Sequence, residues 1–211
     1  IDELRNLPTE TEWVEFKHDN KDPDMIAKRL SALANSATLR DIPHAYLVWG
    51  IDDGSHEVLG TTFNPRKAKK GGEEIENWLH HVLSENASFH FFSVEYEDKK
   101  VVLAQVEPAR GHTVDYQSTA YIRVGSITKK LKDYPSMESE VWNHISRTHF
   151  ESDSARGGLK SEEALSLLDY SKYFSLLGVP MPQSHSEILH ALGEDDIVRR
   201  QEDGQYSITN L

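Results

Sequence analysis

The chain contains no cysteine, and this absence excludes disulfide bonds and thiolate metal sites. Any bound metal ion would therefore need carboxylate or histidine ligands. The sequence also lacks an apolar run long enough to cross a membrane and a leader in which charged residues precede apolar ones. We therefore expect no association with membranes and a location in the reducing cytoplasm.

Basic residues are in the minority, because 23 Lys and Arg stand against 35 Asp and Glu, for a formal net charge of -12. This balance argues against a protein that coats nucleic acid non-specifically, since neutralising phosphates requires a basic face. The few cations are nevertheless clustered at residues 66–70 and 129–132. We expect local positive patches within an acidic chain.

With 211 residues, of which 37% are hydrophobic, the chain is long enough for one full domain and a small second module. Apolar spacing predicts helices and strands in alternation. The helices are expected at residues 1–8, 24–37, 73–83 and 135–150, and the strands at 14–17, 45–51, 57–60, 89–96, 100–107 and 120–124. This order favours the α+β class, with a mixed, largely antiparallel sheet and packed helices.

The domain boundary is predicted from composition. Residues 1–150 form the first domain, and residues 151–160 are polar, contain two adjacent glycines and are typical of a linker. Residues 161–211 predict two helices followed by a hairpin, which favours a small winged-helix-like module; a plain helical extension is the alternative. Because the chain begins with Ile1 and not Met, we expect it to be a piece of a longer protein.

Two stretches suggest a polar site. Residues 9–17 combine three glutamates and a lysine with apolar residues, and the apolar strand at 45–51 ends in Asp52 and Asp53. In an extended chain Glu15 and Lys17 share one face and Phe16 lies on the other. A strand that is buried along its length and ends in acids commonly presents a polar site.

Four motifs in order resemble the Schlafen/AlbA-type nucleic-acid-binding domain over about residues 8–150. They are Glu10 and Glu15 in E-x4-E-F-K, Ala34-Asn35-Ser36, Gly50-Ile51-Asp52-Asp53, and YIRVGSIT at residues 121–128. The resemblance implies an α+β core found in bacterial transcriptional regulators. Longer members of this ATP-binding family have a divergent, ATPase-like region after this domain. The resemblance also implies that residues after 160 are the start of that region.

The resemblance further implies relatedness to eukaryotic Schlafen proteins, some of which cleave tRNA or rRNA with two glutamates and an aspartate. By motif these acids are Glu10, Glu15 and Asp53 in this chain. The chain departs from the family's pattern at two points. The chain has Asn35-Ser36-Ala37 where Ala-Asn-Thr and a glycine pair are more common, and it lacks the cysteines of the Schlafen zinc site.

The three acids Glu10, Glu15 and Asp53 could hold Mg²⁺ or Mn²⁺, because hard divalent cations prefer converging carboxylate oxygens. Such an ion would activate water for attack on a phosphodiester. The alternative is that Glu15 pairs with Lys17 or a buried arginine. In that case Asp52 and Asp53 simply form the turn before Gly54.

Residues around the predicted turn at Gly125 suit contacts with phosphates, because cations and hydroxyls position a nucleic-acid backbone without reading its sequence. The candidates are Arg123, Ser126, Thr128, Lys129 and Lys130, together with Lys17, Arg66 and Lys67 elsewhere in the chain. The alternative is a solvated hairpin tip whose arginine pairs with an acid.

Three hypotheses follow. The first is a module that binds nucleic acid, either DNA or RNA, at the front of a regulator. The second is an endoribonuclease dependent on Mg²⁺ or Mn²⁺ that uses the three acids. The third, favoured by the net acidity, is a protein-interaction domain that forms homo-oligomers.

Overall fold

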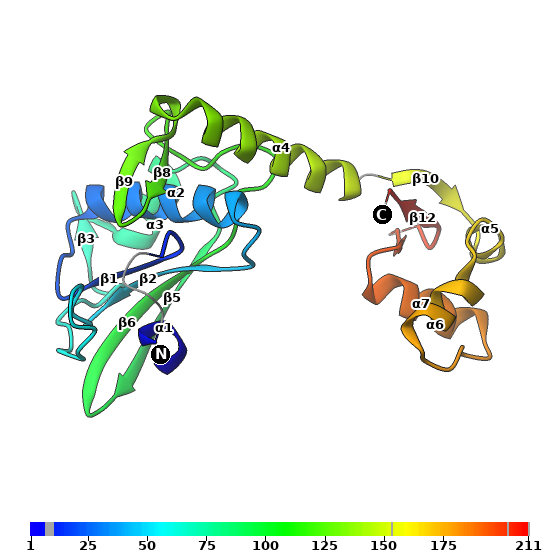
Figure 1. Ribbon diagram of the computed structural model, residues 1–211, viewed down its shortest axis with the longest axis horizontal. Helices are drawn as coiled ribbons and strands as arrows, with labels where there is room; N and C mark the ends of the chain where they lie inside the picture. Colours follow the sequence, from blue (N-terminus) through cyan, green and yellow to red (C-terminus); the bar gives the residue numbers. More distant parts are fainter. Residues whose placement is uncertain (7–10, 153, 202, 211) are drawn as a thin grey trace. The chain divides into compact units, whose positions relative to one another are not determined.

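The computed structural model describes residues 1–6, 11–152, 154–201 and 203–210 (Figure 1). The chain divides into two compact units, Ile1–Ser146 and Arg147–Leu211. Each unit is described by itself below.

The first unit contains most of the regular structure. In chain order its elements are α1 (Asp2–Arg5), β1 (Val14–Lys17), α2 (Pro23–Leu39), β2 (Ala45–Trp49), β3 (Lys69–Lys70), β4 (Glu73–Glu74), α3 (Ile75–Val82), β5 (Phe89–Tyr96), β6 (Lys99–Val106), β7 (Asp115–Tyr116), β8 (Thr119–Val124), β9 (Ile127–Lys130) and the 3-10 helix η1 (Leu131–Asp133). The helix α4 (Pro135–Ser152) begins in the first unit and ends in the second.

The main sheet has four strands in the order β1-β2-β6-β5. The strands β1 and β2 are parallel, whereas β2 with β6 and β6 with β5 are antiparallel. A second sheet has the order β7-β8-β9, and its pairs are antiparallel. Helices and mixed, largely antiparallel strands thus confirm the predicted α+β class.

The helix α2 organises the larger core. It begins where Asp22 accepts a hydrogen bond from the Met25 amide at 2.8 Å and Pro23 occupies the first turn, which is a favourable helix start. Its apolar residues, among them Ile26, Leu30 and Leu33, are buried against one face of the main sheet (Figure 1). The predicted helix is confirmed.

The opposite face of the main sheet is covered by a smaller apolar cluster that includes Val14, Phe16 and Val48, with Leu4 of α1 packed against it. Because Phe16 lies in this cluster while Glu15 contacts a residue of α2, the predicted alternation along β1 is confirmed. The polar side chains of β1 therefore point toward α2.

The prediction of a return strand at residues 57–60 is wrong. In the described structure these residues form no strand, and only Val58 makes an isolated bridge, to Ile51. The reason is the turn that precedes it. The carboxylate of Asp52 accepts hydrogen bonds from the amides of Gly54 at 3.1 Å and Ser55 at 2.8 Å, which bends the chain into a short loop. These bonds, from Ser55 first and then Gly54, lower the pKa of the Asp52 carboxyl.

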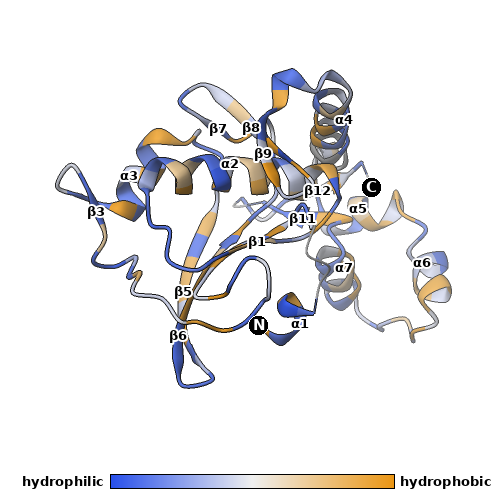
Figure 2. Cartoon of the chain, turned by 60° about the vertical axis from the view of Figure 1, so that its left-hand side comes forward, coloured by the Kyte–Doolittle hydropathy of each residue, from blue (hydrophilic) through white to orange (hydrophobic). Residues whose placement is uncertain are grey.

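The β5–β6 hairpin is the longest strand pair, and its predicted strands are confirmed within one or two residues. Its turn residues Glu97 and Asp98 both adopt positive φ angles, of 50° and 56°. This conformation is typical of two-residue hairpin turns. The tip of the hairpin is strongly hydrophilic, as Figure 2 shows.

The second unit is a small unit of helices and antiparallel strands. Its elements are β10 (Ser154–Leu159), α5 (Ser161–Ser166), α6 (Tyr170–Leu177), α7 (His185–Glu194), β11 (Val198–Arg200) and β12 (Tyr206–Thr209). The strands form a sheet in the order β10-β12-β11, and β11 and β12 are the predicted hairpin.

Within the stretch predicted as a linker, residues 154–159 form the strand β10, which pairs with β12. The pairing register shifts twice along β10, between Ser154 and Arg156 and again between Arg156 and Leu159, where the two glycines lie. Such an irregular strand, with five exposed residues, lacks the alternation by which strands are recognised in a sequence. No described helix is long and apolar enough to cross a membrane.

Candidate nucleic-acid interface

One face of α2 carries buried polar side chains, which is unusual for a helix in a core. They are Ser31, Asn35, Ser36 and Thr38. Ser31, Asn35 and Ser36 bond to backbone groups of Val114 and of β8, and Thr38 donates to the carbonyls of Ala34 and Ala109. Each buried donor and acceptor that is satisfied in this way avoids a desolvation penalty of about 1–3 kcal/mol.

Asn35 makes the largest number of these contacts. Its amide nitrogen donates to the carbonyls of Val114 at 2.9 Å and Tyr121 at 2.8 Å, and its amide oxygen accepts from the Val114 backbone at 2.9 Å. Ser31 accepts from the Tyr121 amide at 3.1 Å, and Ser36 accepts from the Arg123 amide at 3.0 Å. The helix therefore holds β8 by its backbone.

The hairpin of β8 and β9 extends from this attachment. Arg123 pairs with Thr128 and Val124 with Ile127, so Gly125 and Ser126 form a two-residue turn. Gly125 has a φ angle of +58°, a conformation that glycine adopts without strain and that this type of turn favours at its first position. The tip projects Ser126 and Ile127 into solvent.

Beneath the hairpin lies a cluster of charged side chains, which we call the Glu15 cluster: the buried Glu15, Arg29 and Arg123, the half-buried Lys17 and the exposed Asp53. One carboxylate oxygen of Glu15 accepts from Nε of Arg29 at 2.6 Å and lies 3.3 Å from Nζ of Lys17. The other accepts from Nη1 of Arg123. Glu15 is 6% exposed and Arg123 3% exposed, so this is a buried ion pair. The alternative prediction, that Glu15 pairs with Lys17 or a buried arginine, describes this arrangement.

Arg123 is the residue whose predicted role conflicts most with its location. Burial lowers the pKa of its guanidinium, while the charge of Glu15 opposes that shift. Its Nε is buried without a hydrogen-bond partner among the described residues. Because the side chain points into the protein, Arg123 is not available to a phosphate in this arrangement, and we assign it the support of the hairpin instead.

The predicted metal ligands are only partly brought together. Nζ of Lys17 lies 2.8 Å from the carboxylate of Asp53 and bridges it to Glu15. The Asp53 side chain is 66% exposed, and Glu10 lies outside the described residues.

The residues that are described do not fit a divalent cation at this point. Both oxygens of Glu15 already contact arginines, and the ammonium of Lys17 occupies the space between the two acids. A metal ion there would meet three positive charges. No three His, Asp or Glu side chains gather as a metal site within the described residues. The metal-dependent endoribonuclease stays a prediction that this geometry does not favour.

The remaining candidates are on the surface. Ser126, Lys129 and Lys130 are exposed, and Thr128 is half-buried; we call these four residues the hairpin surface. Neither lysine forms an ion pair with a described acid. Arg66 and Lys67 are likewise exposed in the loop before β3, without an acid partner in the described part of the chain.

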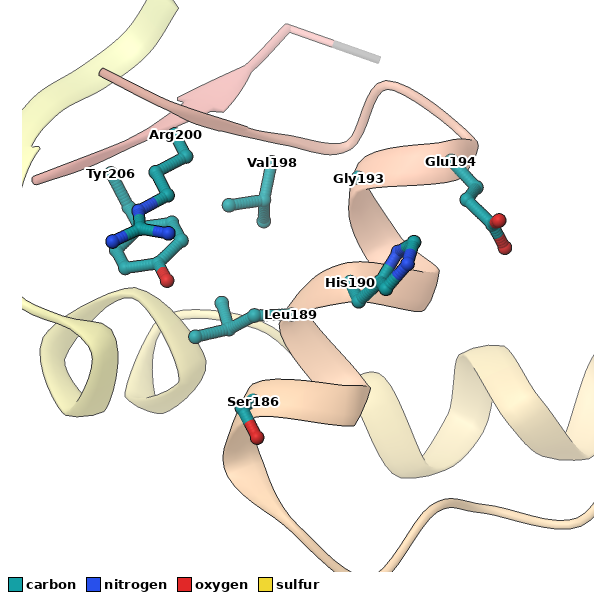
Figure 3. A pocket seen from close by; sticks show the side chains of 8 residues that line it. All are labelled: Ser186, Leu189, His190, Gly193, Glu194, Val198, Arg200 and Tyr206. Carbon is teal, nitrogen blue, oxygen red and sulfur yellow. The ribbon is translucent and has the colours of Figure 1, made fainter. Parts of the chain in front are cut away.

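The second unit offers a different surface. A hollow of about 490 Å³ lies between α7 and the β11–β12 hairpin (Figure 3). Leu189 and Val198 line its apolar side, and His190, Glu194 and Arg200 lie around it. The helix α7 contains no Lys or Arg, which a helix that binds a phosphate backbone would need. The cationic surface of interest is therefore that of the first unit.

Fold and site together define an α+β domain that displays a cationic hairpin on a support of buried helix side chains and ion pairs. A family model makes this class more specific: the Schlafen, AlbA_2 model matches residues 10–132. The match covers more than half of the chain, and the chain belongs to this family. The family is associated with nucleic-acid binding in general.

Solved structures add a distant likeness. The DIP2311 protein from Corynebacterium diphtheriae is 16% identical, with a TM-score of 0.44, over 95% of this chain and 36% of that protein. The chain thus spans about a third of that protein's length. No curated protein matches the sequence.

The polar face of α2 was not assigned a role from the sequence. A signal was present, because Ser31, Asn35 and Thr38 follow the spacing that places residues on one side of a helix. A polar stripe inside an otherwise apolar helix indicates buried hydrogen bonds to a neighbouring backbone.

Proposed function

We propose that the first unit binds nucleic acid by its phosphate backbone, through the hairpin surface, as a module of a bacterial transcriptional-regulator-like protein in the cytoplasm. The observation that carries this proposal is the sorting of its cations. Arg29 and Arg123 are buried against Glu15, whereas Lys129 and Lys130 are exposed and face no acid partner among the described residues. Only exposed cations without an acid partner can exchange solvent ions for phosphates.

The sequence after the hairpin surface extends this positive region. Leu131 is fully buried and anchors η1. The exposed Lys132 follows it directly, two residues after Lys130. Three lysines within four residues are thus attached to a buried anchor. A fixed group of cations loses less conformational entropy on binding than a mobile tail would.

The hydroxyls and backbone of the turn complement the lysines. Ser126 is exposed next to Gly125, and Thr128 lies one residue before Lys129. Hydroxyl and backbone donors commonly accompany Lys and Arg at phosphates. Such contacts are made with DNA and RNA alike, so the proposal covers both. Arg66 and Lys67 belong to it as a second, smaller group of exposed cations.

The proposal is tested by titrating labelled single-stranded and double-stranded oligonucleotides with the whole chain and following fluorescence anisotropy at low salt. Replacing Lys129 and Lys130 together with Ala should weaken binding at least about tenfold for every sequence, because phosphate contacts carry no sequence information. Lys172→Ala, an exposed lysine of the second unit, is the matched control and should bind as the unchanged protein does. Equal binding by the double variant and the control would reject the proposal.

A further inference from the structure

A polar hollow of about 520 Å³ lies on the first unit, beside the loop that carries Arg66. We call it the β5 hollow. The residues of its lining that matter here are Asn64, Arg66, Glu76, Phe91, Ser93 and Lys100. Its volume is within the range of small-molecule sites.

The hollow arises from the way β5 leaves the core. Phe89, Phe91 and Ser93 share one face of the strand, and they are buried, half-buried and exposed in that order. The inner face of the sheet thus becomes open toward the hairpin tip. The ring of Phe91 is held there by aromatic neighbours, at centroid distances of 6.1 Å from Trp49, 6.2 Å from Phe63 and 5.8 Å from Phe89.

The other walls are also fixed in place. The loop from Asn64 is closed by hydrogen bonds from the amides of Lys67 at 3.0 Å and Ala68 at 2.9 Å to the Asn64 carbonyl. Lys100 donates to the Phe63 carbonyl at 2.6 Å, which places its charge at the edge of the hollow. The hollow is therefore formed before any ligand arrives.

Four polar side chains around the hollow are unused. The amide of Asn64, the guanidinium of Arg66, the carboxylate of Glu76 and the hydroxyl of Ser93 make no hydrogen bond or ion pair with any described residue. Elsewhere in the unit, comparable groups are engaged, as in the pair of Lys70 with Asp24 at 2.7 Å. Unused donors and acceptors that converge on one hollow beside a fixed aromatic ring are typical of a binding site.

We infer that the β5 hollow binds an unpaired guanine nucleotide. Bases outside a duplex are recognised by stacking on aromatic rings and by hydrogen bonds to their exposed edges, and Phe91 supplies such a ring. The carboxylate of Glu76 only accepts hydrogen bonds. Guanine presents two neighbouring donors, N1–H and the N2 amino group, to one carboxylate, whereas the other bases present a single donor group beside an acceptor. Arg66, with Lys100 behind it, supplies positive charge for the phosphate.

The same chemistry is present in a guanine within a single strand and in a free guanine nucleotide. We infer that the bound guanine is part of a single strand, which rests on the proposed function and names its substrate class. Binding of free GMP is measured separately, so that the two sources are distinguished.

The test uses the whole chain and fluorescence anisotropy with two labelled probes: a short oligouridylate, and the same strand with one central guanine. The guanine strand should bind about tenfold more tightly, as expected for a two-bond contact to one base. The Glu76→Gln variant should bind both strands with the same affinity, equal to that of the unchanged chain for the oligouridylate. Phe91→Leu should weaken both strands about fivefold or more, because every base can stack. Glu85→Gln, an exposed glutamate just after α3, should behave as the unchanged chain does.

Each outcome has one meaning. Equal binding of both strands by the unchanged chain, or a guanine preference that survives Glu76→Gln, would overturn the β5 hollow while leaving the proposed function intact. If neither strand binds but GMP does, and Glu76→Gln abolishes that binding, the proposed function fails and the hollow is a site for free nucleotides. If strands and GMP all fail to bind, both proposals are rejected. A cooperative urea unfolding transition shows that each variant folds, and Phe91→Leu is expected to have a lower midpoint because its ring packs against the core.

Discussion

Glu15 is the only anion whose carboxylate contacts both buried arginines in the described structure, so Glu15→Gln tests the support of the hairpin surface. The variant keeps the shape of the side chain and removes its charge. Arg123, at 3% exposure, then loses the charge of the acid that contacts its guanidinium. Removing one partner of a buried pair costs about 3–5 kcal/mol. Because domains of this kind have total stabilities of about 5–15 kcal/mol, the loss would be a large fraction of the free energy of unfolding.

Urea unfolding followed by tryptophan fluorescence measures this loss without interference from the second unit. All four tryptophans, at positions 13, 49, 78 and 142, lie in the first unit. With a slope of about 2 kcal/mol per molar urea, a loss of about 4 kcal/mol lowers the midpoint by about 2 M.

Glu12→Gln is the matched control for this measurement. Glu12 pairs with Arg40, whose side chain is about half exposed, so removal of the charge should cost less than about 1 kcal/mol. Combining Glu15→Gln with Arg123→Met removes one of the two buried arginines that have lost their acid and should recover part of the lost stability. If Glu15→Gln were no more destabilising than Glu12→Gln, the assignment of Arg123 as a supporting residue would be refuted.

Three further predictions follow from the same geometry. Asn35→Ala leaves the backbone groups of two segments without partners and should lower the free energy of unfolding by about 2–3 kcal/mol, measured by the same urea titration against Asn77→Ala on the exposed side of α3. Burial and the hydrogen bond to Asp24 raise the pKa of Tyr116 from 10 to about 12, so its contribution to stability is complete below pH 10 and is lost as the pH rises toward 12; Tyr116→Phe should abolish this part of the pH dependence. When the purified protein and its Asp53→Ala variant are each incubated with tRNA and Mn²⁺, the two should cleave the tRNA to the same extent or not at all. Cleavage by the unchanged protein that is lost in Asp53→Ala would establish the endoribonuclease.

The elements that could be predicted from the sequence are those whose signal is local. The helix start at Asp22 and Pro23, the apolar stripe of α2 and the β5–β6 hairpin all depend on residues close in sequence. The alternation of β1 was equally accessible. By contrast, β10 depends on its pairing with β12, about fifty residues further along the chain, and its own composition resembles a loop.

The candidate site shows the same limit more sharply. Lys129 and Lys130 could be predicted as surface cations, because a polar hairpin tip is exposed in almost any fold. The partner of Arg123 could not, since Glu15 lies 108 residues away in sequence and only the packing of β1, α2 and β8 brings them together. Whether a cation meets a ligand or an internal acid is therefore decided by tertiary structure, and residue type alone does not reveal it.

The dependence of oligonucleotide binding on salt tests the central claim most directly. Each lysine that neutralises a phosphate contributes about 0.7 to the slope of log affinity against log salt for a single strand. The account predicts that replacing Lys129 and Lys130 with Ala reduces this slope by about 1.4, while Lys172→Ala leaves it unchanged. A slope that is the same in the double variant as in the unchanged protein would contradict the assignment of the hairpin surface to phosphates.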